Sequence, residues 1–156
     1  MEQYQKNLLG HAMLVLVIGL LAGFMLAFSL IGGLEILPTV FMGIPVFGTA
    51  DGWVRAHSGG ILNALLMVAI AFALPHCRLA MDRLTLYAKG IIFAGWANTV
   101  FYWFGNASAN RALSFTDNTL GAANILGTVG YFVAVIAALV TIFIAAQMAR
   151  GFLSKD

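Results

Sequence analysis

Residues 8–34 read LLGHAMLVLVIGLLAGFMLAFSLIGGL, and no Asp, Glu, Lys or Arg lies between Lys6 and Glu35. A helix that crosses the hydrocarbon core of a bilayer needs about 20 mostly apolar residues, so this stretch is long enough to cross. Three more charge-free stretches are also long enough, and they cover residues 56–77, 90–110 and 118–149. The sequence therefore predicts an all-α membrane protein, a four-transmembrane-helix bundle formed as a single domain.

The overall composition agrees with this fold class. Of the 156 residues, 62% are hydrophobic and 9% are charged, whereas an ordinary soluble domain has about 25% charged residues. A single cysteine, Cys77, excludes a disulfide framework. The predicted membrane spans within residues 1–156 lie at about residues 8–30, 57–74, 87–104 and 120–148.

The basic residues predict the orientation of the bundle. Six of the eight lie in the N-terminal segment, the middle loop and the C-terminal segment, namely Lys6, Arg78, Arg83, Lys89, Arg150 and Lys155. The other two are Arg55 and Arg111. The positive-inside rule then places both termini in the cytoplasm. The net charge of +2 gives no indication of a nucleic-acid partner.

Aromatic residues at the ends of the predicted spans suggest interfacial belts. Tyr4 and Tyr87 lie at the expected inner interface, and Trp53 and Trp103 lie at the outer one. Because Tyr and Trp are enriched at membrane–water interfaces, the simplest interpretation of all four is an aromatic belt.

Polar side chains gather at the outer end of the predicted bundle. His57 and Asn63 lie on the second span, and Asn98, Tyr102 and Asn106 follow one another in four-residue steps on the third. Residues four apart share one helical face. Three further polar residues, Arg111, Asp117 and Asn124, lie in or just after the next loop. Polar groups inside a membrane are costly, so each one is a candidate functional residue.

Structural interpretations of the same residues remain open. The asparagines serve equally well as hydrogen-bonding contacts between helices, and a single histidine at a helix end is more often an interfacial residue than a ligand. Arg111 has a nearby candidate ion-pair partner in Asp117. His11 and His76 lie near the expected inner ends of their spans, where contact with solvent is a sufficient explanation.

The histidine spacing restricts any metal chemistry. His57 and His76 are separated by 19 residues on one predicted helix, which is roughly 28 Å at 1.5 Å per residue. They cannot hold one metal between them, and no H-x-x-H, H-E-x-x-H or C-x-x-C pattern is present. If His57 binds a metal, it does so as the only protein ligand, as when one imidazole holds the iron of a macrocycle.

Five stretches carry a resemblance to a known family. They are Gly10-His11, residues 31–38 (IGGLEILP), residues 52–59 (GWVRAHSG) with Asn63, residues 95–98 (GWAN) through Phe101-Tyr102, and the asparagine-rich residues 106–115 (NASANRALSF). In this order and spacing they resemble the styrene oxide isomerase family, small bacterial membrane enzymes that convert aryl epoxides to aldehydes. The resemblance is weakest between Asp117 and Asn124 and assigns no role to either residue.

The resemblance implies a homotrimer with ferric haem b at the subunit interfaces. His57 would then be the axial iron ligand, and Asn63 and Tyr102 would hold the epoxide. It also implies a styrene monooxygenase upstream as the source of the epoxide. The alternatives are a small membrane haem protein for electron transfer or sensing, and a structural or transport subunit.

Helix geometry and charge add two expectations to this resemblance. Asn63 follows His57 by six residues, which places it about 9 Å further along the helix and about 120° around it. Asn63 and Tyr102 are therefore expected to reach a haem held by a neighbouring subunit. Arg55 and Arg111 are expected to pair with the haem propionates because of their charge.

Overall fold

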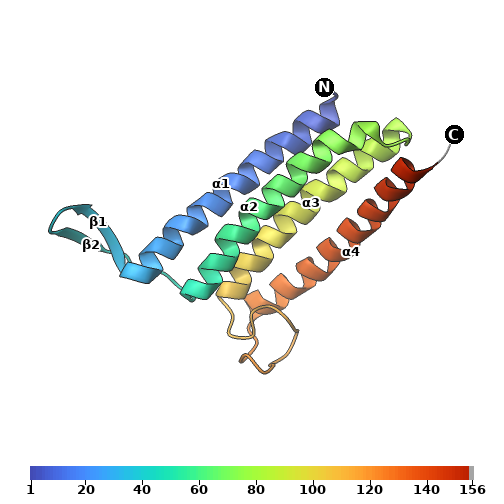
Figure 1. The fold of residues 1–156 in the computed structure, drawn as a ribbon. Helices are drawn as coiled ribbons and strands as arrows, with labels where there is room; N and C mark the ends of the chain where they lie inside the picture. Colours follow the sequence, from blue (N-terminus) through green and yellow to red (C-terminus); the bar gives the residue numbers. More distant parts are fainter. Residues whose placement is uncertain (155–156) are drawn as a thin grey trace.

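The computed structural model describes residues 1–154 as four long helices that run side by side, with a small hairpin beyond the first (Figure 1). In chain order the elements are α1 (Gln3–Ile31), β1 (Gly33–Leu37), β2 (Val40–Gly43), α2 (Ala50–Ala73), η1 (Leu74–His76), α3 (Met81–Asn106) and α4 (Ile125–Leu153). The predicted helical architecture is confirmed in outline. Lys155, which contributed to the predicted orientation, lies outside the described residues.

Three of the helices are long and apolar enough to cross a membrane, namely α1, α2 extended through His76, and α4. Helix α3 has 26 residues and packs against its three neighbours, but it carries Asp82, Arg83, Lys89 and two asparagine side chains. The described part of the chain therefore contains three clear candidate spans, and the fourth crossing stays a prediction.

The ends of the first two helices follow from local sequence. Helix α1 begins with a capping box between Glu2 and Gln5, and it ends where Gly32 adopts a left-handed φ of 79°. Helix α2 begins at a Thr49 cap, whose side chain accepts a hydrogen bond from the Gly52 amide. Pro75 follows its last turn because proline cannot continue the hydrogen-bond ladder.

The fourth helix begins later than predicted, at Ile125 and not near residue 120. Asn124 is its N-cap and accepts a hydrogen bond from the Gly127 amide at 2.8 Å. The apolar residues just before it belong instead to a loop that pairs Asn118 with Gly121. Hydropathy alone does not separate such a packed loop from a first helical turn.

The prediction of an all-α fold is wrong for the connection between α1 and α2. Strands β1 and β2 pair antiparallel, with Leu37 opposite Val40. Pro38 and Thr39 form the turn, and Thr39 has a left-handed φ of 75°, which is the conformation that a type II turn requires at its third position. The apolar runs on either side of this turn form a hairpin.

Close packing of α1 on α2 depends on small residues. A Cβ added to Gly60 would lie 2.7 Å from the Gly19 Cα, and one added to Gly19 would lie 3.0 Å from the Gly60 carbonyl carbon. Because neither Gly19 nor Gly60 has a side chain, the two helix backbones can approach each other directly at this point. This crossing fixes the spacing of α1 and α2 beside the polar residues of α2.

The interpretation of the terminal aromatics as lipid-facing belts is wrong for three of the four. Tyr4 and Tyr87 are buried in the main core cluster, together with Leu8, Met67 and Ile91. Trp53 is completely buried; its Nε1 donates to the Phe47 carbonyl at 2.9 Å, and its ring packs edge-on against Trp103. These rings hold the ends of the bundle together from inside.

Candidate functional site

Helix α2 presents its candidate residues on two different faces. The His57 ring lies against α1, where it contacts Gly19 and Gly23. Gly59, on another face, packs against the Tyr102 ring of α3, and Asn63 accepts a hydrogen bond from Asn98 of α3 at 3.4 Å. The 120° rotation that separates His57 from Asn63 therefore directs them to different neighbouring helices.

The His57 imidazole is held by the backbone and small residues of α1. Its Nδ1 lies 2.9 Å from the Gly19 carbonyl oxygen, a contact that requires a proton on Nδ1. A Cβ added to Gly23 would lie 2.8 Å from both Cε1 and Nδ1, so only glycine leaves space for the ring. The Gly19-x-x-x-Gly23 pattern thus orients the ring and leaves Nε2 as the nitrogen with a free lone pair.

The row of polar residues predicted on α3 does share one face, and this face is turned toward α2. Asn98 bonds to Asn63, and the Tyr102 ring lies over Gly59. Asn106 lies over Gly48 and Gly52, and its Oδ1 accepts from the Thr49 amide at 2.9 Å. The amide side chains therefore do link helices, which was the structural alternative from sequence.

Two of these amides retain an unused donor. The Nδ2 atoms of Asn63 and Asn106 are buried and have no hydrogen-bond partner within the described chain. A buried N–H without a partner costs about 1–3 kcal/mol. Such donors are available to a ligand that carries an oxygen acceptor.

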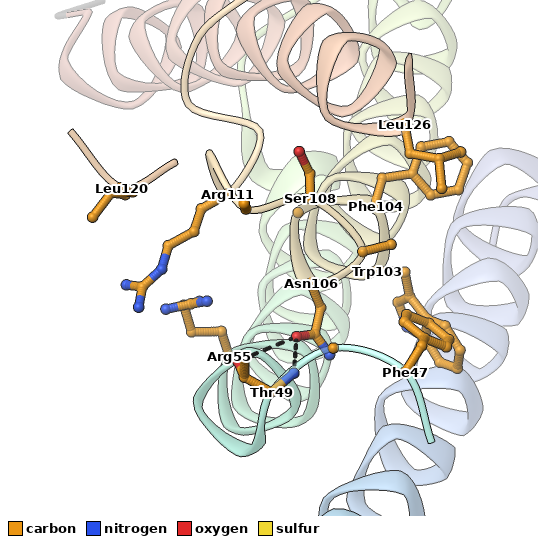
Figure 2. A pocket seen from close by; sticks show the side chains of 14 residues that line it. Phe47, Thr49, Arg55, Trp103, Phe104, Asn106, Ser108, Arg111, Leu120 and Leu126 are labelled. Atoms are coloured by element: carbon orange, nitrogen blue, oxygen red, sulfur yellow. Dashed lines mark hydrogen bonds between the residues drawn. The ribbon is translucent and has the colours of Figure 1, made fainter. Parts of the chain in front are cut away.

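A cleft of about 780 Å³ opens at the end of the bundle that is predicted to face outward, here called the outer end, between the start of α2, the end of α3 and the loop that follows it. Figure 2 shows the guanidinium groups of Arg55 and Arg111 pointing toward each other at one side, and the amide of Asn106 beside Thr49. A smaller cavity of about 200 Å³ adjoins both arginines and is also lined by Tyr102. Both openings therefore carry positive charge beside aromatic surface.

The two arginines have no ion pair among residues 1–154. Their positive charges act on each other, and Asp51, one turn before Arg55, partly offsets them. The alternative pairing of Arg111 with Asp117 is absent, because Asp117 instead accepts a hydrogen bond from the Ala123 amide at 2.8 Å. Two converging guanidinium groups favour an anionic ligand or partner at this end.

The loop that presents Arg111 is organised by the fully buried Asn110, which the sequence places in a polar loop without indicating a role for it. The Asn110 Oδ1 accepts from the Ser108 hydroxyl at 2.7 Å and the Ala112 amide at 3.1 Å. Its Nδ2 donates to the carbonyls of Ser114 and Thr116. The many Asn, Ser and Thr residues in this segment could have indicated such an ordered loop, since their side chains form hydrogen bonds to nearby backbone groups.

Backbone conformation adds to the constraint on Arg111. Arg111 and Ala112 both have left-handed φ values, 58° and 55°, a region that costs non-glycine residues about 1 kcal/mol or more each. The Arg111 carbonyl lies so close to Gly105 that an added Cβ would be 2.9 Å from it. The hydrogen bonds of Asn110 offset this cost and hold the arginine in place.

Among the described residues, Asn124 and His11 make structural contacts, whereas His76 does not. Asn124 caps α4 and donates to the Ala107 carbonyl at 2.8 Å. His11 is partly exposed and also accepts a hydrogen bond from the Trp96 Nε1 at 3.1 Å, so contact with solvent does not describe its environment fully. His76 is exposed, as expected.

The described residues contain no group of three or more His, Cys, Asp or Glu side chains that could hold a metal ion. A cofactor that needs one axial imidazole fits better, because His57 offers an oriented ring with Nε2 free. The structure therefore brings Arg55, Arg111 and Tyr102 together and Asn63 with Asn98, while His57 lies on another face of the same helix.

Two comparisons with known proteins bear on this arrangement. Residues 4–153 match the sequence profile of the family described as styrene oxide isomerase. A styrene-oxide isomerase from Pseudomonas fluorescens is 39% identical over 125 residues, which cover 80% of this chain and 74% of that protein. The residues matched by the profile include every residue of the outer-end cluster, and the chain belongs to the styrene oxide isomerase family.

Proposed function

We propose that this protein isomerises aryl epoxides such as styrene oxide to aldehydes such as phenylacetaldehyde, with ferric haem b bound by His57. Membership of the family makes it an isomerase that acts on epoxides. In this reaction the benzylic C–O bond opens, a hydride moves from the neighbouring carbon to the benzylic carbon, and the oxygen becomes a carbonyl. Substrate and product contain the same atoms, so no oxidant, reductant or water is consumed.

The observation that carries the proposal is the environment of His57. When bound, ferric haem supplies a Lewis acid that withdraws electron density from the epoxide oxygen. The hydrogen bond from Nδ1 to the Gly19 carbonyl fixes the ring and makes Nε2 a stronger donor toward a metal. His57 would be the one protein ligand of the haem, and other residues would hold the substrate.

Asn63 and Tyr102 are suited to hold the epoxide. The Asn63 Nδ2 is a buried donor without a partner, and the Tyr102 hydroxyl forms no hydrogen bond within residues 1–154. Both can donate to an epoxide oxygen, on which negative charge grows as the ring opens.

The aromatic surroundings protect the developing positive charge. Water would trap a benzylic cation as a diol, and the apolar rings around Tyr102 exclude it. Each aromatic face that meets the cation contributes about 0.5–2 kcal/mol. Phe101 and Trp103 flank Tyr102 on α3, and Phe101 lines the same small cavity.

The complete site would be assembled from two subunits of a homotrimer. In one chain the His57 ring lies against α1, whereas Asn63 and Tyr102 lie at the packing surface of α2 and α3. Because these faces differ, a haem held by His57 of one chain would meet Asn63 and Tyr102 of an adjacent copy, which would supply the hydrogen-bond donors.

Arg55 and Arg111 would hold the carboxylates of haem. They converge at the outer end without an ion pair in the described chain, and guanidinium groups bind carboxylates with paired hydrogen bonds. We also assign the protein to a bacterial inner membrane with both termini in the cytoplasm. A styrene monooxygenase would act upstream, because epoxidation of an aryl alkene produces the required substrate.

The first test compares His57→Ala with His76→Ala, a matched substitution at an exposed histidine. The His57→Ala protein should purify without a Soret band and without epoxide isomerisation, and the His76→Ala protein should keep both. The assay is run without reductant, because isomerisation needs no redox cycling. A His57→Ala protein with haem and full activity would refute the assignment, and turnover that needs a reductant would favour electron transfer.

The second test mixes His57→Ala and Asn63→Ala subunits, each inactive alone. In randomly mixed trimers about one interface in four joins an intact His57 to an intact Asn63 of the next copy. Co-expression should therefore restore up to about a quarter of the wild-type activity per trimer. If activity stays absent although mixed trimers form, each site lies within one chain.

A further inference from the structure

The hairpin of β1 and β2 extends away from the bundle beyond the outer end of α1 (Figure 1). Six of its nine strand residues are large and apolar, two are glycine, and one is Glu35. Their side chains are unusually open: Ile36, Leu37 and Phe41 expose 55%, 62% and 55% of their surface.

The strand register leaves apolar residues on both faces of the hairpin. Leu34 lies opposite Met42, and Glu35 lies opposite Phe41; successive residues alternate between faces, so these two pairs occupy different sides. An isolated two-stranded hairpin is marginal in water, and its strand edges are open to pairing. A hairpin of this composition needs a covering surface.

The charge of Glu35 favours protein over lipid as the surface that covers the hairpin. Glu35 lies in the middle of β1 on the same face as Phe41, and it is the only charged residue between Lys6 and Asp51. Immersing this face in lipid would bury an unpaired carboxylate, which costs several kcal/mol. A protein surface with a guanidinium group removes that cost.

The same chain carries a protein surface with guanidinium groups, and no residue of its own hairpin lines the cavity at that surface. Arg55 and Arg111 line the cavity of about 200 Å³ together with Phe101 and the exposed Leu113. This cavity lies on the α2–α3 side of the molecule, whereas the hairpin points outward past α1 (Figure 1). A second copy, placed beside the first, brings hairpin and arginines together.

We propose that the hairpin of each copy docks on the outer end of the next copy, with Glu35 directed at Arg55 and Arg111 of the partner subunit. A five-residue strand extends about 17 Å, more than the 8–10 Å between packed helices, so the hairpin reaches beyond the first helix that it meets. A contact between two different surfaces closes into a ring when the rotation between neighbouring copies adds up to a full turn, which for a trimer is about 120° per copy. The proposal deepens the oligomer proposed above and is independent of haem, and two guanidinium groups have enough N–H donors for Glu35 and haem carboxylates together.

Cysteine cross-linking in native membranes tests the contact directly. The doubly substituted chain Ile36→Cys with Leu113→Cys should give dimer- and trimer-sized products on a non-reducing gel after mild oxidation. Ile36→Cys with Leu153→Cys is the matched control, because Leu153 is also exposed but lies at the inner end. The first pair should give at least five-fold more product than the control; equal yields would overturn the proposal.

A nitroxide label on Phe41→Cys identifies the covering surface independently. Low collision rates with both oxygen and a water-soluble nickel complex indicate a protein-covered hairpin and support docking. High collision with oxygen indicates lipid, and high collision with the nickel complex indicates water; either result rejects docking. The same samples are inspected for a Soret band, so cross-linking without haem would refute only the haem assignment.

Discussion

At the scale of single residues, the position of the His57 ring depends on the absence of a side chain at Gly23. The imidazole occupies the space that a Cβ would fill, and from there Nδ1 reaches the Gly19 carbonyl at 2.9 Å. The orientation of a candidate metal ligand is thus encoded on a different helix from the ligand itself.

Gly23→Ala should displace the His57 ring and break its hydrogen bond to Gly19, while the helices stay formed. Loss of one such bond corresponds to about 1–1.5 kcal/mol, so we expect the affinity for haem to fall about ten-fold. Haem titration followed at the Soret band measures this. Gly10→Ala is the control, because a Cβ there meets nothing within 4 Å; equal affinities in both variants would contradict the expectation.

Asn110→Ala should destabilise the outer loop. Its side chain is fully buried and makes four hydrogen bonds, so its removal leaves several backbone groups unpaired. We expect a loss of about 2–4 kcal/mol, measured by thermal unfolding in detergent. Thr119→Ala, a substitution of an exposed residue in the same loop, should change the stability little. A similar loss of stability in both variants would show that the hydrogen bonds of Asn110 do not contribute specifically to the stability of the loop.

At the scale of elements, the crossing of α1 and α2 is set by backbone contact. Gly19 and Gly60 approach so closely that neither position has room for a methyl group. The neighbouring Gly59 admits the Tyr102 ring of α3 in the same way. Two adjacent glycines in α2 therefore fix its distance to both neighbouring helices.

Gly60→Ala should separate α1 from α2, because the nearest atom to its Cβ is backbone and cannot move alone. Overpacking of this kind costs about 1–3 kcal/mol. Gly10→Ala, whose Cβ would meet nothing within 4 Å, serves as the control in the same thermal assay. A melting temperature unchanged in Gly60→Ala would mean that the helices can slide apart without cost.

At the scale of the whole molecule, the outer end carries the candidate site and the inner end carries most of the basic residues. Cys77 lies at the inner end, and burial raises the pKa of its thiol. Less of it is thiolate at neutral pH than for an exposed cysteine, so its background reaction with maleimides is slow and rises with pH. Introduced cysteines can therefore report on orientation.

Thr119→Cys should react with a membrane-impermeant maleimide in intact spheroplasts, and Ser154→Cys should react only after lysis. This follows from the positive-inside rule with both termini in the cytoplasm. The unsubstituted chain at pH 7 is the control for Cys77. The reverse labelling pattern would show that the bundle has the opposite orientation in the membrane.

The sequence by itself determined the helical architecture and the residues of the outer-end cluster. Runs of apolar residues and four-residue steps act locally, so α1, α2 and the Asn98–Tyr102–Asn106 face were predictable. Local patterns did not predict the hairpin or the late start of α4, because both depend on turns and on side-chain bonds within a packed loop.

Only the tertiary structure decided which helix each candidate residue faces. The direction of His57 toward Gly19 and Gly23, and of Tyr102 toward Gly59, results from contacts between segments far apart in sequence. Such contacts depend on how closely two backbones approach, which a one-dimensional pattern does not record. The same holds for Arg55 and Arg111, which the folded chain brings to one cavity from elements more than fifty residues apart.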